Sequence, residues 1–334
     1  MPSLDPVISP TIANQKAKKV VPGIEPGLLE SESRVITITL HNLVVKGTNI
    51  FLTGGSGFIG SVVIPTAIAR NYIVHALSRT PATDEKIQVD AVVHLATAYE
   101  FGKTASYDDV IPVDIAALDA IADGVAGTET SVVTTSGTLV VAADPRGEET
   151  DESAAEDPEP LNTRVKVEKY GLSLVETRGV KVMSVRLAPY VYGRGGSGVR
   201  RWMELAKMVG SVICVDGGVN RTTTVHVDDA AELYLKAAER GRAGEVYNAS
   251  RDTKVTAKEI FGAVAEIMGV EVTDMDFETV KDRFGVVLAR FLNVENRASG
   301  AKARTELGWE IKGQGILKEI REGSYRQVAE ELRK

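Results

Sequence analysis

The stretch NIFLTGGSGFIGS, from Asn49 to Ser61, constrains the fold of this chain more than any other feature. Gly55, Gly57 and Gly60 follow a short apolar run and open a helical pattern. In that context the G-x-G-x-x-G spacing allows a tight turn, close approach of the backbone to a pyrophosphate, and close packing of helix on strand. The helix N-terminus then offers free N–H groups to phosphate oxygens. We therefore predict a dinucleotide cradle made of Thr53, Gly54, Gly55, Ser56, Gly57, Phe58, Ile59 and Gly60.

Apolar runs of strand length recur between residues 47 and 193 and alternate with helical stretches. The runs are NIFLT, IVHAL, DAVVHLA, SVVTTS and KVMSVRL. Nearly continuous apolar strands separated by helices indicate a parallel sheet covered on both faces. We expect an α/β, Rossmann-type, doubly wound NAD(P)-binding domain over residues 47–193 and a smaller, mainly substrate-binding domain over residues 194–334. Residues 1–46, with several prolines and scattered charge, are expected to be a mostly disordered extension, although RVITITLHNLVV has a strand-like pattern.

Composition favours a small molecule as the partner. Lys and Arg total 39 against 46 Asp and Glu, a net charge of -7, which argues against nucleic acid or an anionic membrane. The single cysteine, Cys214, excludes a disulfide framework and fits a reducing compartment. No apolar stretch reaches the ~18 residues that a bilayer requires, and the isolated His94 and His226 predict no metal site. We expect a cytoplasmic protein, with organelle targeting by the N-terminal extension left open.

The end of the second strand bears on the choice of dinucleotide. IVHAL runs into Ser78 and Arg79, at the place where an acidic residue would hold the ribose of NAD and an arginine can accept the 2′-phosphate of NADP. NADP is therefore the predicted cofactor. If Arg79 is instead a solvated loop residue, NAD stays possible.

Several motifs, in order along the chain, resemble one family, the extended short-chain dehydrogenase/reductases, also called the NAD-dependent epimerase/dehydratase family. TGGSGFIG resembles the family's cofactor turn, DAVVHLAT its fourth strand, VVTTSGTLVV the strand end with the catalytic serine or threonine, and VRLAPYVYGRGG the segment beside the nicotinamide. The resemblance implies cofactor contacts from Leu95, Ala96, Thr97 and Pro189. It also implies a small-molecule substrate and, because members often dimerise through two helices, a homodimer.

The chain departs from this family in length before the fourth strand. Only 11 residues separate Ser78 from Asp90, whereas a helix and a further strand need on the order of 20 or more. One edge strand–helix unit of the sheet is therefore expected to be missing. Its loss would leave the second strand as an exposed edge and remove one wall of the adenine pocket.

The second departure concerns the family's catalytic pair, a tyrosine and a lysine four residues later. The helix after the serine strand reads PEPLNTRVKVEKYGLSLVE, so the pair becomes Pro160 and Arg164, or Asn162 and Lys166 in a register shifted by two. The predicted catalytic residues are then Ser136, Thr138 and Arg164, of which Ser136 and Thr138 hydrogen-bond the substrate and Arg164 holds the nicotinamide ribose or an oxyanion. Alternatively Ser136 and Thr138 satisfy a strand-end turn. The proton would come from Tyr99, Glu100, Tyr192 or water.

These features predict an NADP(H)-dependent oxidoreductase that acts on a small carbonyl or alcohol. Two alternatives stay open: a redox-neutral epimerase, dehydratase or isomerase that uses tightly bound NAD(P), and a non-catalytic NAD(P)-binding regulatory protein. The acidic segment GEETDESAAEDPEP, residues 147–160, is interpreted as a solvated loop that would also suit a lid.

Overall fold

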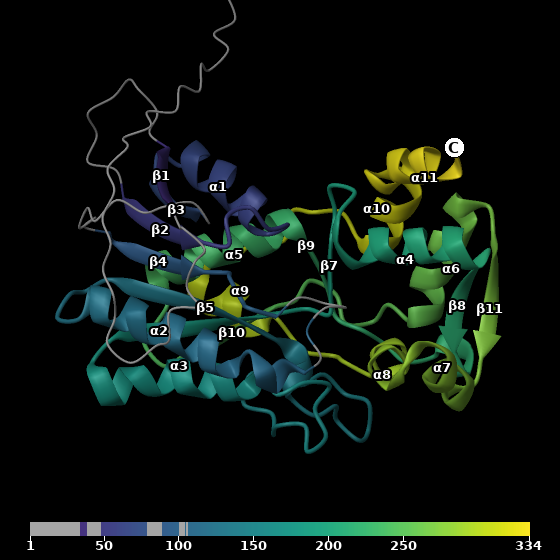
Figure 1. The fold of residues 1–334 in the computed structure, drawn as a ribbon, viewed down its shortest axis with the longest axis horizontal. Helices are drawn as coiled ribbons and strands as arrows, with labels where there is room; N and C mark the ends of the chain where they lie inside the picture. The colour runs from purple at the N-terminus through teal and green to yellow at the C-terminus, as the bar shows by residue number, and fades with distance from the viewer. Residues whose placement is uncertain (1–33, 39–47, 79–88, 100–103, 105) are drawn as a thin grey trace, which may run out of the picture.

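A seven-stranded sheet forms the centre of the larger lobe (Figure 1). The computed structural model describes residues 34–38, 48–78, 89–99, 104 and 106–334. Six of the strands are parallel. In spatial order the strands are β1 (Arg34–Ile38), β3 (Ile73–Ser78), β2 (Asn49–Thr53), β4 (Ala91–His94), β5 (Ser131–Gly137), β6 (Lys181–Leu187) and β10 (Val246–Ala249).

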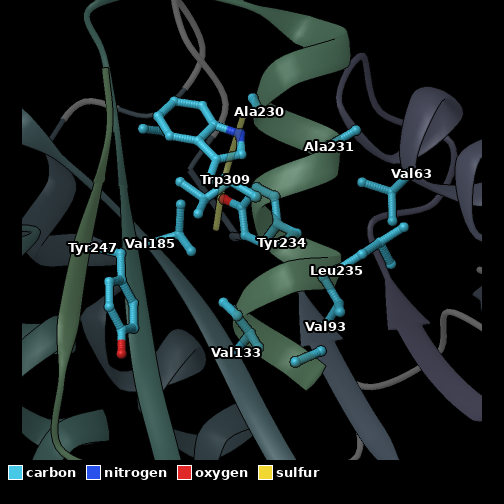
Figure 2. Close-up of a cluster of buried hydrophobic side chains, with 14 of the residues drawn as sticks. Val63, Val93, Val133, Val185, Ala230, Ala231, Tyr234, Leu235, Tyr247 and Trp309 are labelled. Carbon is cyan, nitrogen blue, oxygen red and sulfur yellow. The ribbon is translucent and has the colours of Figure 1, made fainter. Parts of the chain in front are cut away.

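Helices cover both faces of this sheet. Helices α1 (Gly60–Ala69) and α5 (Val227–Arg240) lie on one face, and α2 (Ile111–Val125) and α3 (Val165–Arg178) lie on the other (Figure 1). Val93 and Val133 point into the cluster with α5 that Figure 2 shows, while their neighbours Val92 and Val132 pack with α2 and α3. This alternation is the two-residue period of a strand buried on both faces. The predicted α/β, doubly wound fold is confirmed.

The outer edge of β3 is covered by the antiparallel strand β1. Arg34 is opposite Ser78 and Ile38 is opposite Val74. The expectation that the second strand becomes an exposed edge is therefore wrong, because a segment from upstream supplies backbone partners for its unpaired N–H and C=O groups. β1 falls within the extension predicted for residues 1–46; the rest of that extension lies outside the described residues.

The smaller lobe has its own apolar core. It contains α4 (Ser197–Val209), α6 (Ala257–Met268), α7 (Phe277–Phe284), α8 (Val286–Asn293), α10 (Ile316–Glu322), α11 (Tyr325–Arg333) and the paired strands β8 (Ser211–Val215) and β11 (Glu271–Met275) (Figure 1). Between the lobes run the short parallel strands β7 (Tyr190–Tyr192) and β9 (Thr224–His226). α5, β10 and α9 (Ala301–Leu307) return to the larger lobe, so the chain crosses between the lobes more than once.

Parallel register brings the functional segments to one edge of the sheet. Thr53 at the end of β2 is level with His94 at the end of β4, and Ser136 on β5 is level with Arg186 on β6. Strand order reverses at β2, which has β3 on one side and β4 on the other. In open α/β sheets, ligands bind outside the carboxyl ends of the strands at such a switch point.

Removing β1 tests whether this added edge strand stabilises the sheet. A chain that begins at residue 47 is expected to melt several degrees below one that begins at residue 34, because β3 loses its antiparallel partner and each backbone hydrogen bond contributes about 0.5–1.5 kcal/mol. Scanning calorimetry of the two chains checks this. Equal melting temperatures would show that β1 adds no stability.

Candidate cofactor and active site

The turn after β2 has no room for side chains at two of its glycines. Gly54 has φ +73°, and a Cβ there would lie 2.9 Å from the backbone nitrogen of Ala96. A Cβ on Gly60 would overlap the Gly54 carbonyl oxygen. The Gly57 N–H donates to that same carbonyl at 3.0 Å, which closes the turn. The turn is therefore as tight as the sequence predicts for a backbone that approaches a ligand closely.

The N-terminus of α1 faces out of this turn without a side-chain cap among the described residues. The N–H groups of Ser61, Val62 and Val63 already donate to the Gly57 and Ile59 carbonyls, so a phosphate would meet the backbone of the turn just before them and the positive end of the helix dipole. Ser56 and Gly57 are exposed at the turn, whereas Phe58 and Ile59 are half-buried against the larger core. These residues fit the pyrophosphate of a dinucleotide. Phe58 also contacts the segment after β7, since a Cβ on Gly196 would overlap its ring.

A hydrogen bond joins the turn to the end of β4. Thr53 Oγ1 and His94 Nδ1 are 2.7 Å apart, and both side chains are buried. Burial lowers the pKa of His94, with a smaller opposing effect from the Asp114 carboxylate, so the imidazole is neutral at pH 7. The Ala96 N–H donates to the Thr53 hydroxyl at 3.4 Å. The predicted cofactor residues Leu95, Ala96 and Thr97 thus come immediately after His94, which the contact with Thr53 fixes in place.

The structure adds little about the remaining predicted cofactor residues, Ser78, Arg79 and Pro189. Ser78 is the last residue of β3 and pairs with Arg34, while Arg79 lies outside the described residues, so the basis for choosing NADP stays a prediction. Pro189 is half-buried between β6 and β7.

A cavity of about 30 Å³ lies at the carboxyl ends of β4 and β5, beneath the start of α3. Its walls come from both strands, from α2 and α3, and from the short 3-10 helix Tyr107–Asp109 that precedes α2. They are formed by His94, Leu95, Ala96, Thr97, Tyr107, Asp114, Leu118, Thr134, Thr135, Arg164, Val167 and Glu168.

A carboxylate, a phenol and a guanidinium meet in this cavity. Asp114 is 5% exposed and accepts from Thr97 Oγ1 and from the Ala98 N–H, both at 2.8 Å. The Tyr107 hydroxyl donates to Asp114 Oδ2 at 3.3 Å and accepts from Arg164 Nε at 3.2 Å. The Arg164 guanidinium carbon lies 5.4 Å from the centre of the Tyr107 ring. This arrangement can hold a fixed positive charge beside a proton donor.

Tyr107 and Asp114 were not predicted from the sequence. Asp114 shares the buried stripe of α2 with Leu118, Ala122 and Val125. A carboxylate at a core position of an amphipathic helix is rare unless it has partners. The aspartate in the apolar stripe was therefore the one sequence feature that could have indicated a buried polar site at Asp114.

The structure separates the two predicted hydroxyl residues. Ser136 is 1% exposed, and its Oγ has no hydrogen-bond partner within the described part of the chain. The Thr138 hydroxyl donates to Asn296 Oδ1 at 2.9 Å, and Asn296 Nδ2 donates back to the Thr138 carbonyl at 3.2 Å. The Ser136 hydroxyl is thus free for a ligand, whereas the Thr138 hydroxyl links the end of β5 to the loop around Asn296.

Other proposed proton donors lie in different surroundings. The Tyr99 ring is 5.3 Å from that of Tyr107, centre to centre. The Tyr192 hydroxyl donates to the Gln314 carbonyl at 2.6 Å, and burial raises its pKa. Glu100 lies outside the described residues.

The acidic segment is a mostly exposed loop that is attached to the protein at a few points. Its Thr150 exchanges backbone hydrogen bonds with residues 297 and 299, at 3.0 and 2.7 Å. Glu152 Oε1 accepts from the Asn248 N–H at the edge of the sheet at 2.8 Å. Burial raises the pKa of the Glu152 carboxyl, with weaker opposing effects from backbone hydrogen bonds. The exposed loop is therefore also attached to the edge strand β10, which the sequence did not predict.

Within the described ranges, no group of three or more His, Cys, Asp or Glu side chains could hold a metal ion. None of the helices there is long and apolar enough to span a membrane.

Comparison with known proteins identifies the family of the chain. Residues 50–250 match the model of the NAD dependent epimerase/dehydratase family. An uncharacterized protein of Schizosaccharomyces pombe is 28% identical over 301 residues, 83% of this chain and 99% of that protein. A 4-hydroxy-2-methyl-3-oxo-4-farnesyl-3,4-dihydroquinoline-1-oxide ketoreductase of Stigmatella aurantiaca is 25% identical over 260 residues, 69% of this chain and 77% of the ketoreductase. The solved structure of human epimerase family protein SDR39U1 with NADPH has a TM-score of 0.67 at 18% identity, covering 83% of this chain and 99% of that one.

Because the family model covers more than half of its residues, the chain belongs to the NAD-dependent epimerase/dehydratase family. This membership confirms the resemblance seen in the motifs. It also confirms the predicted class of cofactor, a nicotinamide dinucleotide.

Replacing each buried hydroxyl separately tests the different states of Ser136 and Thr138. Ser136→Ala is expected to leave the free energy of unfolding unchanged or to raise it, because it removes a buried hydroxyl without a partner, a group that costs about 1–3 kcal/mol. The matched variant Thr138→Val should lower the free energy of unfolding by roughly 1–3 kcal/mol, since it removes the side-chain donor to the buried Asn296 Oδ1. Urea unfolding measures both. Equal losses in the two variants would show that Ser136 has a structural partner.

Proposed function

We propose that this protein is an NADP(H)-dependent oxidoreductase that acts on a small carbonyl or alcohol. The observation that carries the proposal is the turn at Gly54–Gly60, in which two glycines exclude side chains and the backbone is exposed at Ser56 and Gly57, just before the positive end of a helix. Family membership supports the use of a nicotinamide cofactor. The NADPH in the human structure and the name of the Stigmatella ketoreductase support NADP(H) and carbonyl reduction.

The chain's own residues have distinct parts in this reaction. The turn and the start of α1 hold the pyrophosphate, and the segment from Leu95 to Thr97 lines the nicotinamide end. Bound nicotinamide supplies or accepts the hydride. Arg164 lines the cavity and provides a cation that does not titrate near neutral pH, whereas the Ser136 hydroxyl is buried outside the cavity lining. The interaction of Arg164 with a substrate oxygen strengthens as negative charge develops on that oxygen, which is how it would lower the barrier.

A redox-neutral epimerase or dehydratase is the second candidate, and the description of the family favours it. The two are separated by the fate of the cofactor. An oxidoreductase consumes NADPH as product forms, whereas a redox-neutral enzyme changes its substrate while the bound cofactor returns to its starting state. A homodimer stays a prediction, which light scattering of the purified protein tests.

Binding of NADPH is the primary test. At about 100 times its Kd, NADPH should stabilise the fold by about 2.7 kcal/mol, which a melting curve resolves. In Gly57→Asp the new side chain projects from an exposed position of the turn. A Cβ there has a single close neighbour, the Gly54 carbonyl oxygen at 3.2 Å. The variant should therefore fold but repel the pyrophosphate and bind NADPH at least ~10-fold more weakly.

Gly124→Asp is the matched control, because Gly124 is exposed on α2 and a Cβ there meets nothing within 4 Å. It adds the same charge away from the turn and should bind NADPH like the unaltered protein. A parallel titration with NADH compares the two dinucleotides. If the unaltered protein binds neither, the proposed function is wrong.

A further inference from the structure

Tyr107 is a phenol that contacts both Asp114 and Arg164, two of the charged side chains that line the cavity. It is 6% exposed, and it belongs to the 3-10 helix before α2, outside the helix on which the family has its tyrosine. Its oxygen accepts from Arg164, and its proton points toward Asp114. The phenol and the cation thus come together from two separate elements, although neither register of α3 contains a tyrosine followed by lysine.

The proton of Tyr107 is weakly held by its present acceptor. Its contact with Asp114 Oδ2 is 3.3 Å long, beyond the usual range of about 2.5–3.0 Å for hydroxyl donors. The same oxygen already accepts from Thr97 at 2.8 Å, and the other carboxylate oxygen accepts from the Ala98 N–H. Asp114 therefore keeps its hydrogen bonds if the Tyr107 hydroxyl rotates toward a different oxygen.

The cavity has room for such an oxygen. Its volume of about 30 Å³ exceeds the ~10–15 Å³ that one water molecule needs. The cavity can therefore take an oxygen atom, such as that of a substrate carbonyl. An oxygen seated there would lie among the groups that line it, which include Tyr107 and Arg164.

We propose that Tyr107 is the proton donor in carbonyl reduction by this protein and that Arg164 stabilises the phenolate that remains. This proposal rests on the proposed function. The carbonyl carbon gains a hydride and the C=O π pair moves to oxygen, which takes the Tyr107 proton and becomes a hydroxyl. The phenolate faces a guanidinium that stays charged and recovers its proton from water. In alcohol oxidation each transfer is reversed.

Tyr107→Phe tests the proposal in the full chain. With NADPH and a panel of 4-nitrobenzaldehyde, phenanthrenequinone and ethyl acetoacetate, kcat should fall at least ~100-fold for every carbonyl that the unaltered protein reduces, which is the usual contribution of a general acid. The Kd for NADPH should stay within about twofold, because Tyr107 lines the cavity and is not part of the turn that holds the pyrophosphate.

Two tyrosine variants serve as controls. Tyr170 also donates to an aspartate, Asp119 of α2 at 2.6 Å, but it does not line the cavity, so Tyr170→Phe removes the same type of hydrogen bond away from the cavity and should keep its kcat. Tyr99→Phe removes the neighbouring rival donor. A large loss in Tyr99→Phe, with Tyr107→Phe unimpaired, would assign the proton to Tyr99 and overturn the proposal.

A spectroscopic measurement distinguishes proton donation from a structural role. The infrared carbonyl band of the same aldehyde or ketone, bound beside NADP⁺ so that no reduction occurs, should lie at lower frequency in the unaltered protein than in Tyr107→Phe, because a hydrogen bond weakens the C=O bond. If the band is the same in both proteins and Tyr107→Phe keeps its turnover, Tyr107 is not the proton donor. That outcome overturns this proposal and leaves the proposed function standing. Absence of NADPH binding, or of turnover with every carbonyl, overturns the proposed function and this proposal with it.

Discussion

The buried ion pair between Glu168 and Arg186 fixes helix α3 on the sheet, and the active-site geometry depends on it. Arg186 Nε lies 3.1 and 3.0 Å from the two carboxylate oxygens, and the side chains are 2% and 9% exposed. A third donor, the Ser184 hydroxyl, lies 3.3 Å away. Breaking one partner of such a pair leaves an uncompensated buried charge, which typically costs ~3–5 kcal/mol. Since Arg186 is level with Ser136 on the neighbouring strand and Glu168 lies one turn after Arg164, the pair sets the position of the start of α3 relative to the end of β5.

This anchoring explains how the site can work without a tyrosine and a lysine on one helix. The usual arrangement relies on the pitch of the helix to bring the two side chains together. Here the ion pair one helical turn away fixes the position of Arg164. Arg164 donates to the Tyr107 hydroxyl, and Tyr107 in turn contacts Asp114, which Thr97 also hydrogen-bonds. The distance between phenol and cation is thus determined by the packing of α2 against α3, a contact between two helices.

Local patterns were predictable from the sequence, and long-range contacts were not. The cofactor turn, the strand–helix alternation and the positions of Ser136 and Arg164 follow from residues adjacent in sequence. The pairing of β1 with β3 joins residues 34–38 to residues 74–78, and a five-residue strand gives no indication of its partner. Likewise the hydrogen bonds that occupy Thr138 come from Asn296, 158 residues later. The acidic segment had the composition of a solvated loop and is mostly exposed, yet it is also attached to the edge strand β10.

The replacement of a parallel unit by β1 changes the adenine end of the site in a specific way. A parallel strand in this position would end level with Ser78 and continue into a loop that borders the adenosine. Because β1 runs the other way, its first residue, Arg34, lies opposite Ser78, so the chain enters the sheet at this edge instead of leaving it. The backbone pairing of the edge is restored, but the loop that would follow a parallel strand is not. Affinity for the dinucleotide should therefore depend mainly on the pyrophosphate turn and the nicotinamide end, where the glycines and the buried Thr53–His94 contact are intact.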